Sequence, residues 1–233
     1  MIHINNFEYL LNVPRNTSTT TMQTAALFDL DGVIINTEGQ YTTFWEEIGK
    51  RDLPHLSDFA QSIKGHTLKQ ILSEYYPNDT AAQQRVINDI NRFEQQMEYP
   101  FIAGAIEFVK ALKEVGIPTA VVTSSNQAKM KVLNEKHPAF ASLFDHIFTA
   151  ENAQRSKPAP DCYLNAAAHF GLEAKQCFVF EDSISGLQAG HDSGATVIGL
   201  TTSNAAQVIQ PYCQLVINDF TEISVAQMCS LQK

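Results

Sequence analysis

Two pairs of acidic residues follow apolar runs and could do chemistry together. Asp29 and Asp31 follow one run, and Glu181 and Asp182 close another. If both runs are central strands of a parallel sheet, the four carboxylates meet at one edge, where each ionised pair about 4 Å apart would repel by roughly 4 kcal/mol. Acidic residues are also common in turns. Two such pairs nevertheless favour a site for a hard divalent cation, and Mg²⁺ suits oxygen ligands and keeps waters or phosphate in its shell.

Polar residues between these pairs could bind an anion. Thr123, Ser124 and Ser125, followed by Asn126, end an apolar run just before a helical pattern. Their hydroxyls and the next backbone N–H groups could hold a phosphate oxygen, although such residues also serve as helix N-caps. Lys157 stands next to two prolines that stiffen the chain. A single lysine is usually a solvated surface charge, and only its place between the acidic runs makes it a candidate.

The elements that must position these residues alternate along the chain. Apolar runs with strand character begin at residue 25 and recur at residues 118–125, 146–150, 177–182, 196–200 and 215–219. Helical patterns separate several of them, at residues 104–115, 127–136, 161–170 and 185–193. This alternation predicts an α/β fold with a parallel sheet that is covered by helices on both faces.

Residues from about 38 to 99 break the alternation. They hold apolar residues at helical spacing and no run rich in β-branched residues. Thr80 and Gln83 have the spacing of a capping box, and an apolar stripe follows over residues 86–97. The segment is therefore predicted to be a helical insert after the first strand.

Composition excludes several classes of protein. Hydrophobic residues make up 44% and charged residues 18% of the 233 residues, which is ordinary for a globular chain and excludes collagen-like or disordered proteins. The formal net charge of −9 gives no basic surface for a nucleic-acid backbone. No apolar run approaches the roughly 18 residues of a membrane span. Neither nucleic acid nor a membrane is an expected partner.

Cysteine spacing and the N-terminal residues bear on location. The four cysteines are scattered over the last third of the chain without C-x-x-C spacing, which fits neither a zinc site nor a disulfide framework. Residues 1–21 have no basic segment followed by a long apolar one, so we expect an extension and no signal peptide. A reduced cytoplasmic protein is the simplest interpretation.

Four motifs in this order resemble the signature of the haloacid dehalogenase superfamily, in particular its phosphatase branch and the subfamily that includes β-phosphoglucomutase. The motifs are DLDGV at 29–33, Thr123, SKPAPD at 156–161, and EDS at 181–183 leading to Gly186. The resemblance implies a Rossmann-like, doubly wound core at residues 22–37 and 100–233. It also implies an α-helical cap domain at residues 38–99, which agrees with the helical insert.

The resemblance also implies catalytic roles. Asp29 would be the nucleophile that forms an aspartyl-phosphate, which splits one difficult displacement into two easier ones. Asp31 would be the general acid for the leaving oxygen and then the general base for water. Thr123 and Lys157 would hold the phosphoryl oxygens. A dehalogenase would not need an acid at position 31, so the pattern favours phosphoryl transfer.

By the same resemblance, Mg²⁺ would be the cofactor. Its implied ligands are the side chain of Asp29, the backbone carbonyl of Asp31 and the side chain of Asp182, with Glu181 as a further candidate.

The predicted cap departs from the mutase pattern. Tyr41 and Leu68 stand where mutases of this subfamily carry a histidine and an arginine that grips the distal group of the sugar phosphate. Losing that guanidinium removes a bidentate anchor for a bisphosphate. Lys64, His66 and Thr67 of the cap loop, together with Tyr41, are the candidate substrate contacts, although His66 could equally face solvent.

We therefore expect a phosphatase that acts on a small phosphorylated metabolite, such as a sugar or polyol phosphate. A β-phosphoglucomutase-type mutase and a catalytically silent phosphate-binding regulator are the alternatives. The expected oligomeric state is a monomer or a weak dimer.

Overall fold

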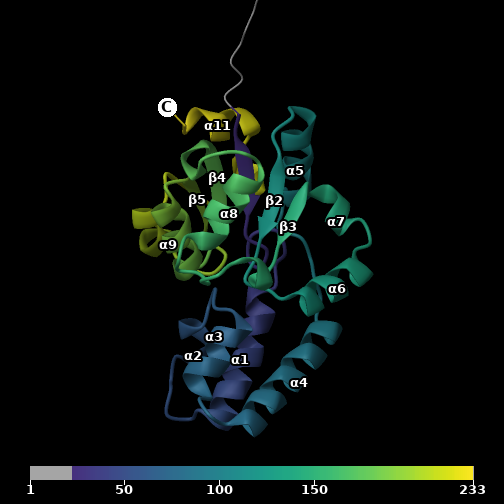
Figure 1. The fold of residues 1–233 in the computed structure, drawn as a ribbon, viewed down its shortest axis with the longest axis vertical. Helices are drawn as coiled ribbons and strands as arrows, with labels where there is room; N and C mark the ends of the chain where they lie inside the picture. The colour runs from purple at the N-terminus through teal and green to yellow at the C-terminus, as the bar shows by residue number, and fades with distance from the viewer. Residues whose placement is uncertain (1–22, 233) are drawn as a thin grey trace, which may run out of the picture.

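The computed structural model describes residues 23–232, in which six parallel strands form one sheet (Figure 1). Its order is β3-β2-β1-β4-β5-β6. The strands are β1 (Ala25–Phe28), β2 (Thr119–Val122), β3 (His146–Phe148), β4 (Cys177–Glu181), β5 (Thr196–Leu200) and β6 (Leu215–Ile217). In the centre, Leu27 of β1 pairs with Ala120 of β2 on one side and with Val179 of β4 on the other. The predicted parallel α/β sheet is confirmed.

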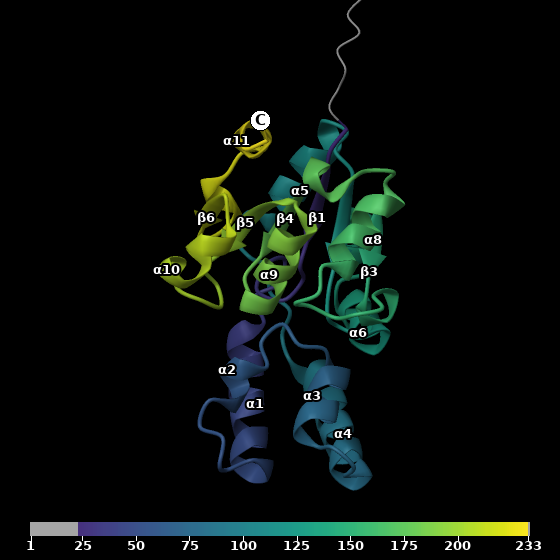
Figure 2. The same ribbon diagram turned by 60° about the vertical axis from the view of Figure 1, so that its left-hand side comes forward.

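Helices cover both faces of the sheet (Figure 2). They are α5 (Ala105–Glu114), α6 (Gln127–Lys136), α7 (Phe140–Leu143), α8 (Asp161–His169), α9 (Ile184–Ser193), α10 (Ala206–Ile209) and α11 (Val225–Ser230). Short 3₁₀ turns lie at η1 (Ala150–Asn152), η2 (Ala174–Gln176), η3 (Gln210–Tyr212) and η4 (Phe220–Glu222). Alternate residues of β1 serve the two faces, as strand geometry requires. Phe28 packs in the cluster of α5 and α11, and Leu27 packs in the cluster of α8 and α9.

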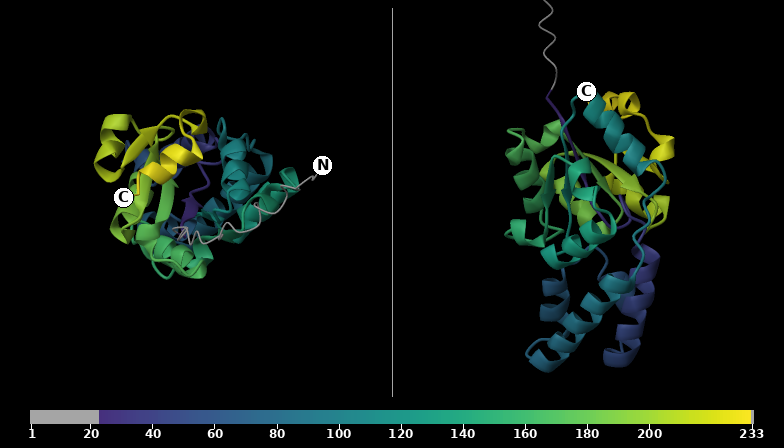
Figure 3. Two further views of the ribbon diagram at one scale, coloured as in Figure 1. Left: turned by 90° about the horizontal axis from the view of Figure 1, so that it is seen from above. Right: turned by 90° about the vertical axis from the view of Figure 1, so that its right-hand side faces the viewer.

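Four helices form a separate layer beyond the end of the sheet where β1 ends (Figures 1 and 3). They are α1 (Glu38–Asp52), α2 (Phe59–Ser62), α3 (Leu68–Tyr75) and α4 (Thr80–Gln96). Their apolar faces meet in a cluster of their own, which includes Trp45, Ile48, Phe59, Ile71, Val86 and Ile90. We call residues 38–99 the cap. That the cap is a separate domain stays a prediction.

The two linkers between cap and core run side by side. Ile35 forms an antiparallel bridge with Phe101. The N–H of Asn36 donates to the carbonyl of Pro100 at 2.7 Å, and the N–H of Ile102 donates to the carbonyl of Ile34 at 2.9 Å. The cap therefore leaves and re-enters the core at one place.

Two details of α4 differ from the sequence expectation. The capping box at Thr80 and Gln83 is wrong, because the N-cap is Asp79, whose carboxylate accepts from the N–H of Ala82 at 2.9 Å. Asp is as good an N-cap as Ser or Thr, and it precedes the predicted pair by one residue. The apolar stripe also contains a charge, since Glu94 is buried with Val86.

The structure also bears on the predictions about membrane spans, cysteines and the N-terminal residues. Within residues 23–232, none of the helices has both the length and the apolar character that crossing a membrane demands. The four cysteine thiols are free. The predicted extension at residues 1–21 lies outside the described residues.

Asp79→Ala should destabilise the protein by about 1 kcal/mol, because it removes the side-chain acceptor at the start of α4. Thr80→Ala, one residue further on, should change the free energy of unfolding by about 0.5 kcal/mol or less. Urea denaturation of both variants measures the difference. A larger loss for Thr80→Ala would contradict the assignment of the cap.

Candidate active site

The sheet order brings the predicted acidic residues together. Asp29 follows β1, Thr123 follows β2, and Glu181 and Asp182 end β4. Because β1 lies between β2 and β4, these residues share the carboxyl edge of three neighbouring strands. Ligands bind at this edge in open parallel sheets.

Lys157 supplies the positive charge at the centre of the cluster. Its Nζ lies 2.6 Å from Asp29 Oδ1 and 2.6 Å from Glu181 Oε1, and it donates to the carbonyl of Val122 at 3.1 Å. Its side chain is only 3% exposed. Burial opposes the ammonium charge, but Asp29 and Glu181 hold the pKa of Lys157 well above its ordinary value. The predicted surface alternative for this lysine is wrong, since the side chain is buried between two carboxylates.

Two aspartates of the cluster, Asp29 and Asp182, are costly to ionise. Burial raises the pKa of Asp29 to about 7, although Lys157 acts in the opposite direction. Burial, followed by the negative charge of Glu38, raises the pKa of Asp182 well above its usual range. Such groups need a further cation if both are to be charged at neutral pH.

A divalent cation fits between these groups. One carboxylate oxygen from each of Asp29, Glu181 and Asp182 lies within 4.8 Å of the others. A set of buried carboxylate oxygens suits a hard cation that takes few protein ligands. The chemistry of the donors and their buried charge therefore both fit Mg²⁺.

Two glycines permit this close approach. A Cβ on Gly186 would lie 1.7 Å from Oε1 of Glu181, and one on Gly32 would lie 2.0 Å from Oδ2 of Asp182. Gly32 also has a φ of +75°, which favours glycine. Any side chain at either position would push a carboxylate out of the cluster.

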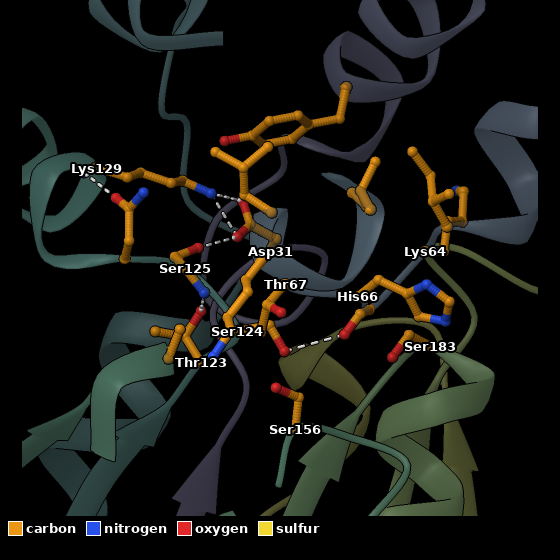
Figure 4. Close-up of a pocket in the computed structure, with 18 of the residues that line it drawn as sticks. Asp31, Lys64, His66, Thr67, Thr123, Ser124, Ser125, Lys129, Ser156 and Ser183 are labelled. Carbon is orange, nitrogen blue, oxygen red and sulfur yellow. Dashed lines mark hydrogen bonds and ion pairs between the residues drawn. The ribbon is translucent and has the colours of Figure 1, made fainter. Parts of the chain in front are cut away.

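Asp31 faces a second lysine that sequence reasoning did not select. Lys129 of α6 has its Nζ 2.5 Å from Oδ1 of Asp31 and also contacts Oδ2 (Figure 4). Ser125 Oγ donates to Oδ2 at 3.1 Å, and Thr37 Oγ1 donates to Oδ1 at 2.5 Å. The sequence carries one indication that Lys129 is buried, because Lys129 lies on the same helical stripe as the apolar Leu133.

The cluster opens into a cavity of about 840 Å³ between core and cap. Asp29, Asp31, Thr123 and Asp182 line its core side. All the predicted substrate contacts line it as well, namely Tyr41, Lys64, His66, Thr67, Ser124, Ser125 and Asn126. Lys157 and Glu181 do not line this cavity and support the carboxylates from the core.

Four of these residues already make hydrogen bonds or ion pairs within the protein. The side chain of Thr67 caps α3, and that of Asn126 caps α6 by accepting from the N–H of Lys129 at 2.9 Å. Ser124 Oγ donates to the carbonyl of Gly65 at 3.0 Å and so joins core to cap. Lys64 is paired with Glu38 at 2.9 Å.

His66 has a different environment from these four residues. Its Nδ1 is buried and has no hydrogen-bond partner among residues 23–232. The residue lines the cavity, and its ring carries one polar atom that no residue of this range satisfies. This placement counts against the alternative in which His66 simply faces solvent.

The sequence as a whole matches one family. The model for haloacid dehalogenase-like hydrolases covers residues 26–200, which include every motif described above. This chain belongs to the haloacid dehalogenase-like hydrolases. The predicted family is confirmed, and so is the prediction of a hydrolase of this type.

Relatives of this haloacid dehalogenase-like hydrolase include named phosphatases. It is 27% identical over 207 residues to validoxylamine A 7'-phosphate phosphatase of Streptomyces hygroscopicus subsp. limoneus, covering 87% of this chain and 96% of the relative. It is 28% identical over 206 residues to hexitol phosphatase A of Escherichia coli, covering 86% and 93%.

Solved structures of the same family share the fold. A family IA, variant 3 hydrolase from Entamoeba histolytica superposes with a TM-score of 0.78 at 30% identity, covering 89% of this chain and 98% of that one. A β-phosphoglucomutase from Clostridium difficile gives 0.72 at 19% identity, covering 89% and 96%, and that likeness concerns the fold alone.

Adding MgCl₂ to this haloacid dehalogenase-like hydrolase should raise its melting temperature, because a ligand bound to the folded state stabilises it by about 2.7 kcal/mol at 100 times its Kd. Asp182→Asn should abolish that shift. The same variant should melt no lower than wild type without metal, since it replaces a carboxyl group whose ionisation burial opposes with a neutral amide.

Thermal unfolding with and without MgCl₂ measures both effects, with Asp192→Asn, an exposed aspartate, as the control. A full magnesium shift in Asp182→Asn would contradict the predicted ligand.

Proposed function

We propose that the chain is a Mg²⁺-dependent phosphomonoesterase that hydrolyses a small phosphorylated metabolite, a sugar or polyol phosphate, through an aspartyl-phosphate on Asp29. One observation carries the proposal. Asp29 has Oδ1 fixed by Lys157 at 2.6 Å, while Oδ2 accepts no hydrogen bond within residues 23–232 and the residue lines the cavity. A carboxylate held at one oxygen and open at the other is placed to act as a nucleophile.

The first step transfers the phosphoryl group to the protein. Oδ2 of Asp29 attacks phosphorus, and the bond from phosphorus to the leaving oxygen breaks. The carboxyl group of Asp31 passes to that oxygen the proton that it gained from water in the preceding turnover, and the oxygen departs as an alcohol. The hydroxyl of Thr123 holds a phosphoryl oxygen, Lys157 keeps Oδ1 of Asp29 in place, and bound Mg²⁺ would neutralise part of the phosphoryl charge.

The second step returns Asp29 to its starting form. A water molecule attacks the phosphorus of the aspartyl-phosphate, and the carboxylate of Asp31 accepts the proton that the water loses. The bond between Asp29 and phosphorus breaks, which releases inorganic phosphate and regenerates the carboxylate.

Asp29, Asp182 and the backbone carbonyl of Asp31 are the proposed ligands of Mg²⁺. Glu181 is better placed to position Lys157. Its Oε1 accepts from Lys157 at 2.6 Å and from Tyr163 at 2.9 Å, and its Oε2 accepts from the N–H groups of Asp182 and Ser183 at 2.9 and 3.1 Å. Both oxygens are therefore occupied, and direct coordination by Glu181 would cost hydrogen bonds.

The charges lining the cavity favour a substrate with one phosphate. Lys64 is neutralised by Glu38 and Lys129 by Asp31, so Lys69 is the lining lysine without an ion pair among residues 23–232. A bisphosphate needs a second strong anion site, which a single exposed lysine does not replace. The relative named hexitol phosphatase A supports a polyol or sugar phosphate.

The mutase remains the second candidate because of the shared fold with a β-phosphoglucomutase. A mutase must protect its aspartyl-phosphate from water and recapture a phosphorylated intermediate by its other end. The paired state of Lys64 argues against that recapture.

Purified protein with MgCl₂ should release phosphate from p-nitrophenyl phosphate and, faster, from members of a panel of sugar and polyol phosphates. Asp29→Asn should lower turnover by at least about 10³-fold, because it removes the nucleophile. Glu98→Gln, which changes an exposed acidic residue just after α4, is the matched control and should keep full activity.

A parallel assay should follow conversion of β-glucose 1-phosphate to glucose 6-phosphate. Isomerisation that outpaces phosphate release would establish the mutase instead. Phosphate binding without turnover would favour the silent regulator, and full turnover by Asp29→Asn would exclude the mechanism.

The remaining expectations stay predictions. They are a monomer or weak dimer, a cytoplasmic location, and no nucleic-acid or membrane partner.

A further inference from the structure

Lys129 is a buried charge outside the motifs that define the family resemblance. It lies on α6, and its side chain is 3% exposed. Its amine contacts both oxygens of Asp31 and lies 4.5 Å from the centre of the Tyr41 ring. Figure 4 shows the side chain reaching from its helix to Asp31. Burying an ammonium is costly, and such a group is kept only where its partners compensate it well.

The cap completes the surroundings of this amine. Tyr41 comes from α1, and its hydroxyl donates to Oε1 of Glu94 on α4 at 2.8 Å. The backbone carbonyl of Glu94 in turn accepts from the hydroxyl of Tyr99 at 2.8 Å. The positive charge of Lys129 acts on Glu94 as well, in opposition to the burial that raises the pKa of that carboxyl. Lys129 therefore lies where a core helix meets two cap helices.

A lysine contacts each of the two aspartates Asp29 and Asp31, but the two carboxylates are held differently. Asp29 has one oxygen held by Lys157 and the other open. Asp31 has both oxygens held, by Lys129 with Ser125 on one side and Thr37 on the other. The hydroxyl contacts are neutral and bind one oxygen each, whereas Lys129 contacts both oxygens and is charged. Charge-assisted hydrogen bonds are roughly twice as strong as neutral ones.

We propose that Lys129 is the positioning residue for Asp31: its amine fixes the carboxyl group that exchanges protons with the leaving oxygen and with water, and the ring of Tyr41, whose hydroxyl is held by Glu94, packs against that amine. The inference rests on the acid–base role given to Asp31 in the proposed function. Lys129 keeps its three protons throughout. The transferred proton moves between Asp31 and the departing alcohol in the first step, and between water and Asp31 in the second.

This role has a kinetic signature that a merely structural lysine lacks. Phenol is a more basic leaving group than p-nitrophenol, so phenyl phosphate depends more strongly on protonation of the leaving oxygen. The two aryl groups are similar in size. A misplaced Asp31 should therefore harm phenyl phosphate more than p-nitrophenyl phosphate, whereas general damage to the fold should harm both equally.

The test measures kcat/KM for both aryl phosphates with MgCl₂ in wild type and Lys129→Met. We expect a loss of about 100-fold for phenyl phosphate and about tenfold or less for p-nitrophenyl phosphate. Lys131→Met, two residues further along α6 with an exposed side chain, is the matched control and should keep wild-type values. Equal losses for the two substrates, or no loss, would overturn the proposal.

Lys129→Arg guards against a variant that fails to fold. It keeps the charge but differs in reach, so it should show a smaller loss with the same dependence on the leaving group. Equal effects on both substrates in this variant would also overturn the proposal.

Asp31→Asn in the same assay separates the two levels of inference. If Asp31→Asn shows the leaving-group dependence and the Lys129 variants do not, the positioning role fails and the proposed function survives. If Asp31→Asn shows none, the acid–base role itself fails.

Discussion

The buried contact of Lys157 with Asp29 and Glu181 is the interaction on which the site depends. Without the ammonium, two carboxylates at adjacent strand ends would face each other in a region that water barely reaches. Removing one partner of a buried ion pair typically costs 3–5 kcal/mol, because the other charge is left uncompensated. The lysine is thus a structural requirement of the acidic edge and also the source of positive potential in a chain with a net charge of −9.

Backbone geometry sets the limits within which that contact can form. Parallel pairing places β1 between β2 and β4, so residues far apart in sequence arrive at one edge. Gly32 then allows the loop after β1 to approach Asp182 after β4, and Gly186 allows the first turn of α9 to approach Glu181, closer than any side chain would permit. These two acidic residues and the glycines form one constraint, because the carboxylates of Asp182 and Glu181 occupy the space where a Cβ would be.

Sequence patterns predicted the residues of the site that belong to short, contiguous motifs. They predicted poorly the residues whose role depends on tertiary contacts. Asp29, Asp31 and Asp182 belong to compact motifs beside apolar strands, so their residue types and spacing were informative. The partner of Asp31 is 98 residues away, and a lysine in a helical pattern normally indicates solvent. The sequence does not predict a role for Glu94 for the same reason, since that role depends on Tyr41 from another helix.

The start of α4 shows a smaller version of the same limit. Asp79, Thr80 and their neighbours offer two overlapping capping patterns, and local sequence alone does not choose between them. The backbone of the preceding turn decides which side chain reaches the free N–H groups.

The adjoining linkers at residues 34–36 and 100–102 have an evolutionary consequence. An inserted segment whose two ends are already bridged, and whose apolar faces are satisfied internally, can be exchanged for another of different length or shape without reopening the sheet. Selectivity for the organic portion of a ligand and the chemistry of bond cleavage can then diversify separately. Substitutions at the contact of Tyr41 and Glu94 of the cap with the region of Lys129 are the exception, since they change selectivity and bond cleavage together.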